Sequence, residues 1–197
     1  MAFQGLFVGI DHYASSQISW LSCAKKDAIA LHALFTDTFG GNATLLTDEN
    51  ATRQEIEKAL QTIASCGDED VVVVAFSGHG SKTHELITYD TTLSDLNNTA
   101  IPLDLLTELF SKIPSRHLLC ILDCCFSGGA GAKVLQTDAQ PKDLLSTSSI
   151  LDSLSGDGRL IFTASKADEP AWENNRLGHG LLTYYLLEAL QGVQEVI

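Results

Sequence analysis

Two glycine-rich segments each follow an apolar run, and each carries a side chain suited to nucleophilic catalysis. His79 lies in Ser-Gly-His-Gly after residues 71–76, and Cys125 lies in Asp-Cys-Cys-Phe-Ser-Gly-Gly after residues 117–122. A thiolate is a strong nucleophile, and a neighbouring imidazole lowers the pKa of the thiol and later protonates the leaving amine. The pattern therefore predicts a Cys–His dyad, on the condition that the two runs form neighbouring strands.

The glycines beside these residues favour tight turns and a close approach of backbone to substrate. We expect the amides of Gly80 and Cys125 to point at a substrate carbonyl oxygen as it gains charge. Each residue alone has a structural alternative, because a cysteine at a strand end is commonly a small buried side chain. The pattern by itself does not distinguish Cys124 from Cys125 as the nucleophile.

The elements that must position these residues follow from the hydrophobic pattern. Apolar runs alternate with amphipathic segments, which predicts an α/β domain with a mainly parallel sheet flanked by helices on both faces. In such a sheet, sites form at the carboxyl ends of the strands. The expected strands cover residues 6–10, 43–46, 71–76, 117–122 and 160–164, with a short extra strand at 85–89. The expected helices cover residues 22–39, 52–64, 102–113 and 181–190, the third with Pro102 as its first residue.

A length of 197 residues fits one domain over residues 1–197. The segment 131–158 is rich in Ser, Asp, Gly and Gln and shows weak periodicity, so we interpret it as a linker. It separates residues 1–130 from residues 159–197.

Composition excludes several classes of function. A formal net charge of −13 argues against binding to nucleic acids or to an anionic membrane surface. No segment approaches the roughly 18 apolar residues that span a bilayer. The start of the chain lacks the features of a secretory signal, and the odd number of five cysteines shows no Cys-x-x-Cys spacing. We therefore expect a cytoplasmic protein with reduced thiols.

The segments SGHG and ILDCCFSGG, with Cys125 46 residues after His79, resemble the clan of caspases, metacaspases, legumain and gingipains. The order Asp-x-Cys-x-Ser-Gly is similar to metacaspases and bacterial caspase-like proteins rather than to the caspase pentapeptide. VGIDHY, LLTDENATRQEIEKAL, LIFTASKADEPAWE and GHGLLTYYLLEAL resemble further parts of that family. The resemblance implies a caspase-like fold with a large-subunit-like part (1–130) and a small-subunit-like part (159–197). It also implies cysteine endopeptidase activity on proteins or peptides, with Cys125 as the nucleophile and Cys124 turned inward.

The resemblance also implies a substrate preference. Asp27, Ser77 and Asp123 match metacaspase positions that line a pocket for a basic side chain, so cleavage after Arg or Lys is expected. The alternatives are that Asp27 is a solvated charge and that Asp123 caps a turn. Arg176, with Glu173 nearby, leaves a preference for acidic residues as the alternative specificity. Trp172 is a candidate wall of the next subsite, with a partly buried surface aromatic as the alternative.

If the pocket takes basic residues, Lys133 and Lys142 in the linker are candidate self-cleavage sites. Many metacaspases need calcium, bound partly by acids just after the nucleophile, but residues 126–136 contain no acid. We therefore expect no metal and no cofactor, with calcium dependence as the alternative. Bacterial relatives often carry C-terminal regulatory domains, and nothing in this chain identifies one.

Two further alternatives remain open. A catalytically inactive caspase-like scaffold or binding module is disfavoured because both His79 and Cys125 are present, and a nucleotide-binding domain is disfavoured because no phosphate-loop motif occurs. The remaining histidines are expected to have structural roles: His12, His32, His84, His117 and His179.

Overall fold

The computed structural model describes residues 1–124, 134–135, 158–164, 173–174 and 176–192. Its centre is a parallel sheet of five strands in the order β2-β1-β3-β7-β9. The strands are β1 (Phe3–Gly9), β2 (Asn42–Thr47), β3 (Val71–Ser77), β7 (His117–Asp123) and β9 (Arg159–Thr163).

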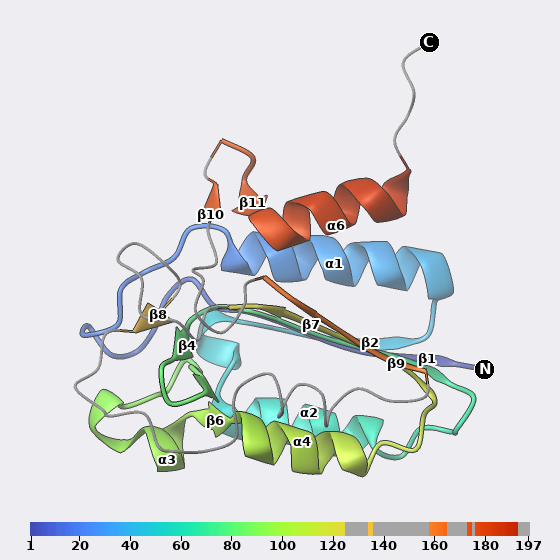
Figure 1. Cartoon of the computed structure of the whole chain (residues 1–197), viewed down its shortest axis with the longest axis horizontal. Coiled ribbons are helices and arrows are strands. Elements are labelled where there is room, and N and C mark those ends of the chain that lie inside the picture. Colours follow the sequence, from blue (N-terminus) through green and yellow to red (C-terminus); the bar gives the residue numbers. More distant parts are fainter. Residues whose placement is uncertain (125–133, 136–157, 165–172, 175, 193–197) are drawn as a thin grey trace.

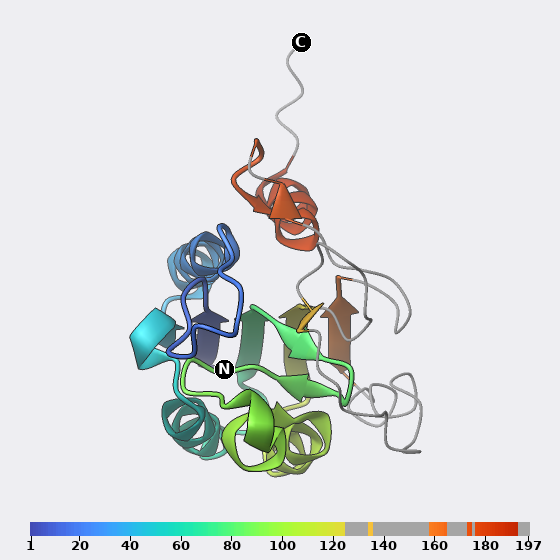
Figure 2. The ribbon, with the colours of Figure 1, turned by 90° about the vertical axis from the view of Figure 1, so that its left-hand side faces the viewer.

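Helices cover both sides of this sheet, which confirms the predicted fold class. Helices α1 and α6 lie on one side, and α2 and α4 lie on the other (Figures 1 and 2). The bounds are Ala24–Phe39 for α1, Arg53–Ile63 for α2, Leu103–Ser111 for α4 and Leu181–Gln191 for α6.

The apolar strand β3 is buried on both faces, as its continuous apolar run predicts. Val72, Val74 and Phe76 belong to the larger core cluster, which includes residues of α2 and α4. Val73 and Ala75 belong to a second cluster, which includes residues of α1 and α6. The sheet is therefore held between two apolar layers, and its strand ends are rigid supports for a site.

Two helix starts differ from the predicted ones. Helix α1 begins at Ala24, since Cys23 before it has a non-helical φ of −127°, and the amides of Ser22 and Cys23 donate to the carboxylate of Glu173. Pro102 precedes α4 instead of starting it, because it pairs with Glu85 in an extended conformation. The cap expected for α2 is present, with the Thr52 side chain accepting a hydrogen bond from the amide of Glu55.

Several short elements lie around the main sheet, and the hydrophobic pattern predicted only one of them, the short strand expected at 85–89, which is present at Glu85–Leu86. Two-residue strands carry too few side chains to show a period. A second sheet has the order β6-β5-β4-β8, and β10 pairs with β11 as a hairpin. These strands are β4 (Gly80–Ser81), β5 (Glu85–Leu86), β6 (Ile101–Pro102), β8 (Val134–Leu135), β10 (Glu173–Asn174) and β11 (His179–Gly180). The short helices are η1 (Asp48–Asn50), η2 (Leu93–Asp95) and α3 (Leu96–Thr99).

The strand order places a switch point between β1 and β3. The chain leaves β1 toward α1 on one face of the sheet and reaches β3 from α2 on the other face (Figure 2). Open parallel sheets bind ligands outside the carboxyl ends of the strands at such a point. The segments that follow β1, β3 and β7 are therefore where a site is expected.

Candidate active site

His79 follows β3 after a single glycine, at the carboxyl edge of the sheet. The parallel register pairs Ser77 of β3 with Asp123 of β7, and the Gly78 amide donates to the Asp123 carbonyl oxygen over 3.3 Å. A side chain at Gly78 would meet the Tyr13 hydroxyl at 3.2 Å and the Phe76 ring at 3.1 Å, so the turn requires a small residue. The predicted adjacency of the two strands is thus confirmed.

Cys125 lies outside the described residues. Its place in the sequence nevertheless corresponds to that of His79. Ser77 pairs with Asp123, and His79 and Cys125 each follow one member of this pair by two residues. The preceding Cys124 is 2% exposed and belongs to the core, as expected for the member of the pair that turns inward.

The imidazole of His79 is held from the loop after β1. Its Nε2 lies 2.8 Å from the carbonyl oxygen of Ser19 and 3.3 Å from the Ser19 hydroxyl. A carbonyl oxygen only accepts hydrogen bonds, so Nε2 carries a proton in this contact. In the neutral ring, Nδ1 is then the nitrogen with the lone pair, which is the tautomer of a base acting through Nδ1.

Tyr13 is the second support of His79. Its hydroxyl oxygen accepts the His79 backbone N–H over 3.0 Å, and the two rings pack with centroids 5.3 Å apart. Burial raises the pKa of Tyr13 far above its ordinary value, so the phenol stays neutral and keeps its proton. His79 itself is 1% exposed. Sequence reasoning missed the roles of both residues: Tyr13 ends the family-like segment VGIDHY but was given no role, and Ser19 belongs to no recognised motif.

Gly80, the predicted oxyanion donor, opens the small second sheet. It is buried in β4, where it pairs with Leu86 on one side and with Val134 on the other. Val134 lies nine residues after Cys125 in the sequence. Its pairing with Gly80 therefore brings the chain back beside the turn that carries His79. The other proposed donor, the amide of Cys125, lies in the part that the structure leaves undescribed.

Asp27 is fully buried, so the alternative of a solvated charge is wrong. Its Oδ2 accepts the Ser77 hydroxyl over 2.9 Å, and its Oδ1 lies 2.8 Å from Nδ1 of His179. The amide of Gly180 lies 3.2 Å from both oxygens. Two of the three predicted pocket residues, Asp27 and Ser77, are therefore in direct contact.

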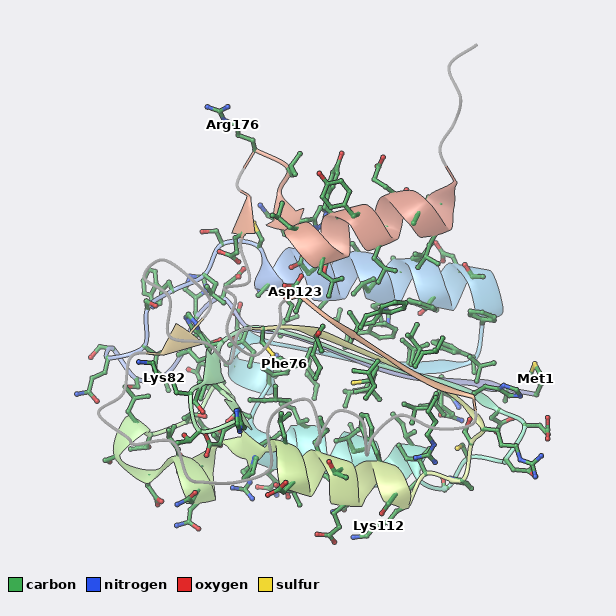
Figure 3. The ribbon with its side chains drawn as sticks, viewed as in Figure 1. Met1, Phe76, Lys82, Lys112, Asp123 and Arg176 are labelled. Carbon is green, nitrogen blue, oxygen red and sulfur yellow. The ribbon has the colours of Figure 1, made fainter. Side chains whose placement is uncertain are left out.

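Asp123 supports the start of α6. Its Oδ2 accepts the Thr183 hydroxyl over 2.8 Å and the Thr183 amide over 3.3 Å. Figure 3 shows Asp123 on the side of the sheet that faces α1 and α6. Because Asp123 pairs with Ser77, which contacts Asp27, the two carboxylates approach the amino end of α6 from adjacent elements.

Of the residues weighed for an acidic preference, Glu173 lies beside the proposed pocket, because it pairs with Gly180, whose amide lies 3.2 Å from both oxygens of Asp27. Glu173 accepts hydrogen bonds from the backbone of Ser22 and Cys23, and Arg176 at the β10–β11 turn points away from the body of the protein (Figure 3). Trp172 and the candidate cleavage sites Lys133 and Lys142 lie outside the described residues.

Within the described ranges, no three His, Cys, Asp or Glu side chains come together in a way that would hold a metal ion. The same part of the chain contains no helix with the length and hydropathy needed to cross a bilayer. Its four cysteines, Cys23, Cys66, Cys120 and Cys124, are buried thiols.

Comparison with known proteins agrees with this architecture. A crystal structure of a Geobacter sulfurreducens protein superposes with a TM-score of 0.73 at 16% identity, covering 97% of this chain and 82% of the other. At that identity the similarity concerns the fold. A search of curated proteins found no match.

The model of the caspase domain, a family of cysteine peptidases, matches residues 4–196. This match spans nearly the whole chain, including His79 and Cys125. The chain therefore belongs to the caspase domain family.

Proposed function

We propose that this protein is a cysteine endopeptidase that cleaves after Arg or Lys, with Cys125 as nucleophile and His79 as general base and acid. The proposal is supported above all by the register that pairs Ser77 with Asp123. Parallel strands in this register bring the turns that follow them to one edge of the sheet. The Ser19 contact adds support, because it fixes the tautomer that a base acting through Nδ1 needs.

In the proposed reaction, His79 Nδ1 takes the proton of the Cys125 thiol, and the sulfur forms a bond to the carbonyl carbon of the substrate. The amides of Gly80 and Cys125 stabilise the oxyanion of the tetrahedral intermediate. As the C–N bond breaks, His79 returns the proton to the leaving amine. Water activated by His79 then hydrolyses the thioester and releases the acid product.

The basic preference is supported by the burial of two carboxylates at this edge. Asp27 is 0% exposed and Asp123 is 1% exposed, and a guanidinium or ammonium group pairs well with such desolvated acids. Arg176, which would serve an acidic preference, points away (Figure 3). The pocket proposed here consists of Asp27, Ser77 and Asp123.

A panel of fluorogenic peptides tests the activity. The peptides differ only in Arg, Lys, citrulline or Asp before the scissile bond, and each is assayed with calcium and with a chelator. We expect hydrolysis of the Arg and Lys peptides, with no requirement for calcium. The Cys125→Ala and His79→Ala variants should be inactive, whereas the His117→Ala variant, altered at the far end of β7, should retain activity. Preferred cleavage of the Asp peptide would overturn the specificity, and hydrolysis of none would favour a scaffold.

Self-processing in the linker is the second part of the proposal. Incubated wild-type protein should yield two fragments whose new termini, identified by mass spectrometry, follow Lys133 or Lys142. The Cys125→Ala protein and a Lys133→Gln/Lys142→Gln double variant should stay intact. Equal integrity of wild type and Cys125→Ala would contradict self-processing without affecting cleavage of added peptides.

A further inference from the structure

The imidazole of His179 lies between the buried Asp27 carboxylate and the protein surface. The distance from Nδ1 to Oδ1 is 2.8 Å, and the His179 side chain is 23% exposed, whereas the Asp27 side chain is 0% exposed. His179 stands in β11, 152 residues after Asp27, and only the packing of β11 against α1 brings the two together. The catalytic steps proposed above give this contact no role.

Both oxygens of Asp27 already receive hydrogen bonds within the protein. The Ser77 hydroxyl donates to Oδ2, the Gly180 amide approaches both oxygens, and His179 occupies Oδ1. A guanidinium binds a carboxylate best through both oxygens at once. An arginine side chain that enters the pocket must therefore displace one of these donors from an oxygen of Asp27.

Of these three donors, His179 is the one whose departure requires the least change. Ser77 is 3% exposed on a core strand, and the Gly180 amide belongs to the backbone that starts α6. The imidazole is partly exposed and can leave by rotation about its side-chain bonds. The turn next to it has room with respect to the described residues, none of which lies within 4 Å of a Cβ built on Gly178, whose φ is +74°.

We infer that His179 is a specificity-determining residue, which sets the affinity of the pocket for basic side chains by competing with the substrate for Asp27. The inference rests on the proposed preference for Arg or Lys. In the free protein the imidazole satisfies a buried carboxylate that would otherwise be costly. A basic substrate side chain replaces it and supplies a stronger, charge-assisted bond.

The competition predicts that losing His179 changes stability and affinity in opposite directions, which a purely structural contact does not predict. Replacing His179 by alanine removes a bond from the free protein but not from the complex. The variant should therefore be less stable when free and should bind a basic side chain more tightly. A structural contact that merely orients Asp27 would instead lower both the stability and the affinity.

Calorimetry with the Cys125→Ala protein, which is expected to bind peptides without cleaving them, tests these opposite predictions for affinity. The two probes are peptides identical except for arginine or citrulline before the scissile bond. We expect His179→Ala to bind the arginine peptide roughly tenfold more tightly, the effect of one hydrogen bond to a charged group. The citrulline peptide should bind almost unchanged, because citrulline keeps the shape of arginine without its charge.

Two further variants serve as controls. His179→Asn keeps an amide donor at the position of Nδ1 and should bind arginine as the parent protein does. His117→Ala removes an equally polar residue that faces Glu69 at the opposite end of the sheet, and it should change neither affinity. Unchanged or weaker arginine binding by a folded His179→Ala protein would overturn the competition, while the peptidase proposal would stand.

A measurement with His179 intact covers the case in which His179→Ala does not fold. Adding the arginine peptide to the Cys125→Ala protein should shift the NMR resonances of the His179 imidazole, assigned by comparison with His179→Asn. The citrulline peptide should leave them in place. Resonances unmoved by bound arginine peptide would refute the competition. Absence of any preference for arginine over citrulline would refute both the competition and the proposed pocket.

Discussion

The Nε2 atom of His79 lies 2.8 Å from the carbonyl oxygen of Ser19, a residue that precedes it by 60 positions. The group that orients the imidazole is thus a neutral backbone carbonyl rather than a carboxylate. Such a partner fixes the tautomer and the ring plane, but it stabilises an imidazolium less than a negative charge would. The loop after β1 is therefore as much a part of the proposed site as the strand that carries His79.

Replacing the Ser19 side chain should matter little, because the main contact comes from its backbone. The Ser19→Ala variant loses only the 3.3 Å contact of the hydroxyl. We expect kcat/KM to stay within about twofold of wild type, the range typical of surface substitutions. A loss of about a hundredfold would show that the hydroxyl, and not the carbonyl, supports His79.

Removing the Tyr13 hydroxyl should reduce both stability and activity. Tyr13→Phe leaves the buried amide of His79 without its acceptor, at a cost of about 1–3 kcal/mol. Thermal unfolding should shift down by several degrees, and kcat should fall because the imidazole loses a fixed position. Tyr185→Phe is the matched control, since Tyr185 is 65% exposed on α6. Equal behaviour of the two variants would contradict a positioning role for Tyr13.

Alkylation should be selective for Cys125 near neutral pH. Burial raises the pKa of the Cys23 thiol to about 11 and that of the Cys120 thiol to about 12, so both stay protonated and unreactive below pH 9. Iodoacetamide at pH 7 should therefore modify Cys125 first, as peptide mapping would show, and His79→Ala should slow that modification. Labelling of Cys23 or Cys120 at the same rate would contradict this order.

The bond between Thr183 and Asp123 should stabilise the docking of α6. Thr183→Val keeps the side-chain shape but removes the donor that lies 2.8 Å from Oδ2 of Asp123. A hydrogen bond to a buried carboxylate predicts a loss of about 2 kcal/mol in the free energy of unfolding, measured with urea. Thr62→Val removes a hydroxyl bonded only to its own helix at the surface and should be nearly neutral. An equal cost for both variants would argue against a special role for Asp123.

The Asp48 carboxylate should make the free energy of unfolding depend on pH. Burial alone would raise its pKa, but hydrogen bonds from Lys25 and from the amides of His12 and Asp11 lower the pKa below 3.8 overall. A lowered folded-state pKa gives stability that is present above pH 4 and is lost as the pH falls through the folded value.

Asn at position 48 tests this dependence, because Asn also tolerates the φ of +45° found there. The Asp48→Asn variant should unfold at a lower temperature than wild type at pH 7, and the difference should shrink by pH 3. The surface variant Asp37→Asn provides the comparison. A difference that stays constant between pH 7 and pH 3 would show that the charge of Asp48 is not responsible.

Local pattern was enough to predict the sheet, its four main helices and the turn that carries His79. Burial on one face leaves a period in the residues of a long element, burial on both faces of a strand leaves a continuous apolar run, and glycines mark the turns. The pattern missed contacts between a helix end and a distant residue. Helix α1 starts at Ala24, and Glu173, far along the chain, accepts hydrogen bonds from the amides of Ser22 and Cys23 just before it.

The partners of the key side chains were decided by tertiary structure. His79 meets Tyr13 and Ser19 across separations of 66 and 60 residues, and Asp27 meets His179 across 152. Such contacts depend on how loops and helices pack around the strand ends, and no local period records them. The residues themselves thus determined which chemistry is available, whereas packing determined which groups orient His79 and which group occupies Asp27.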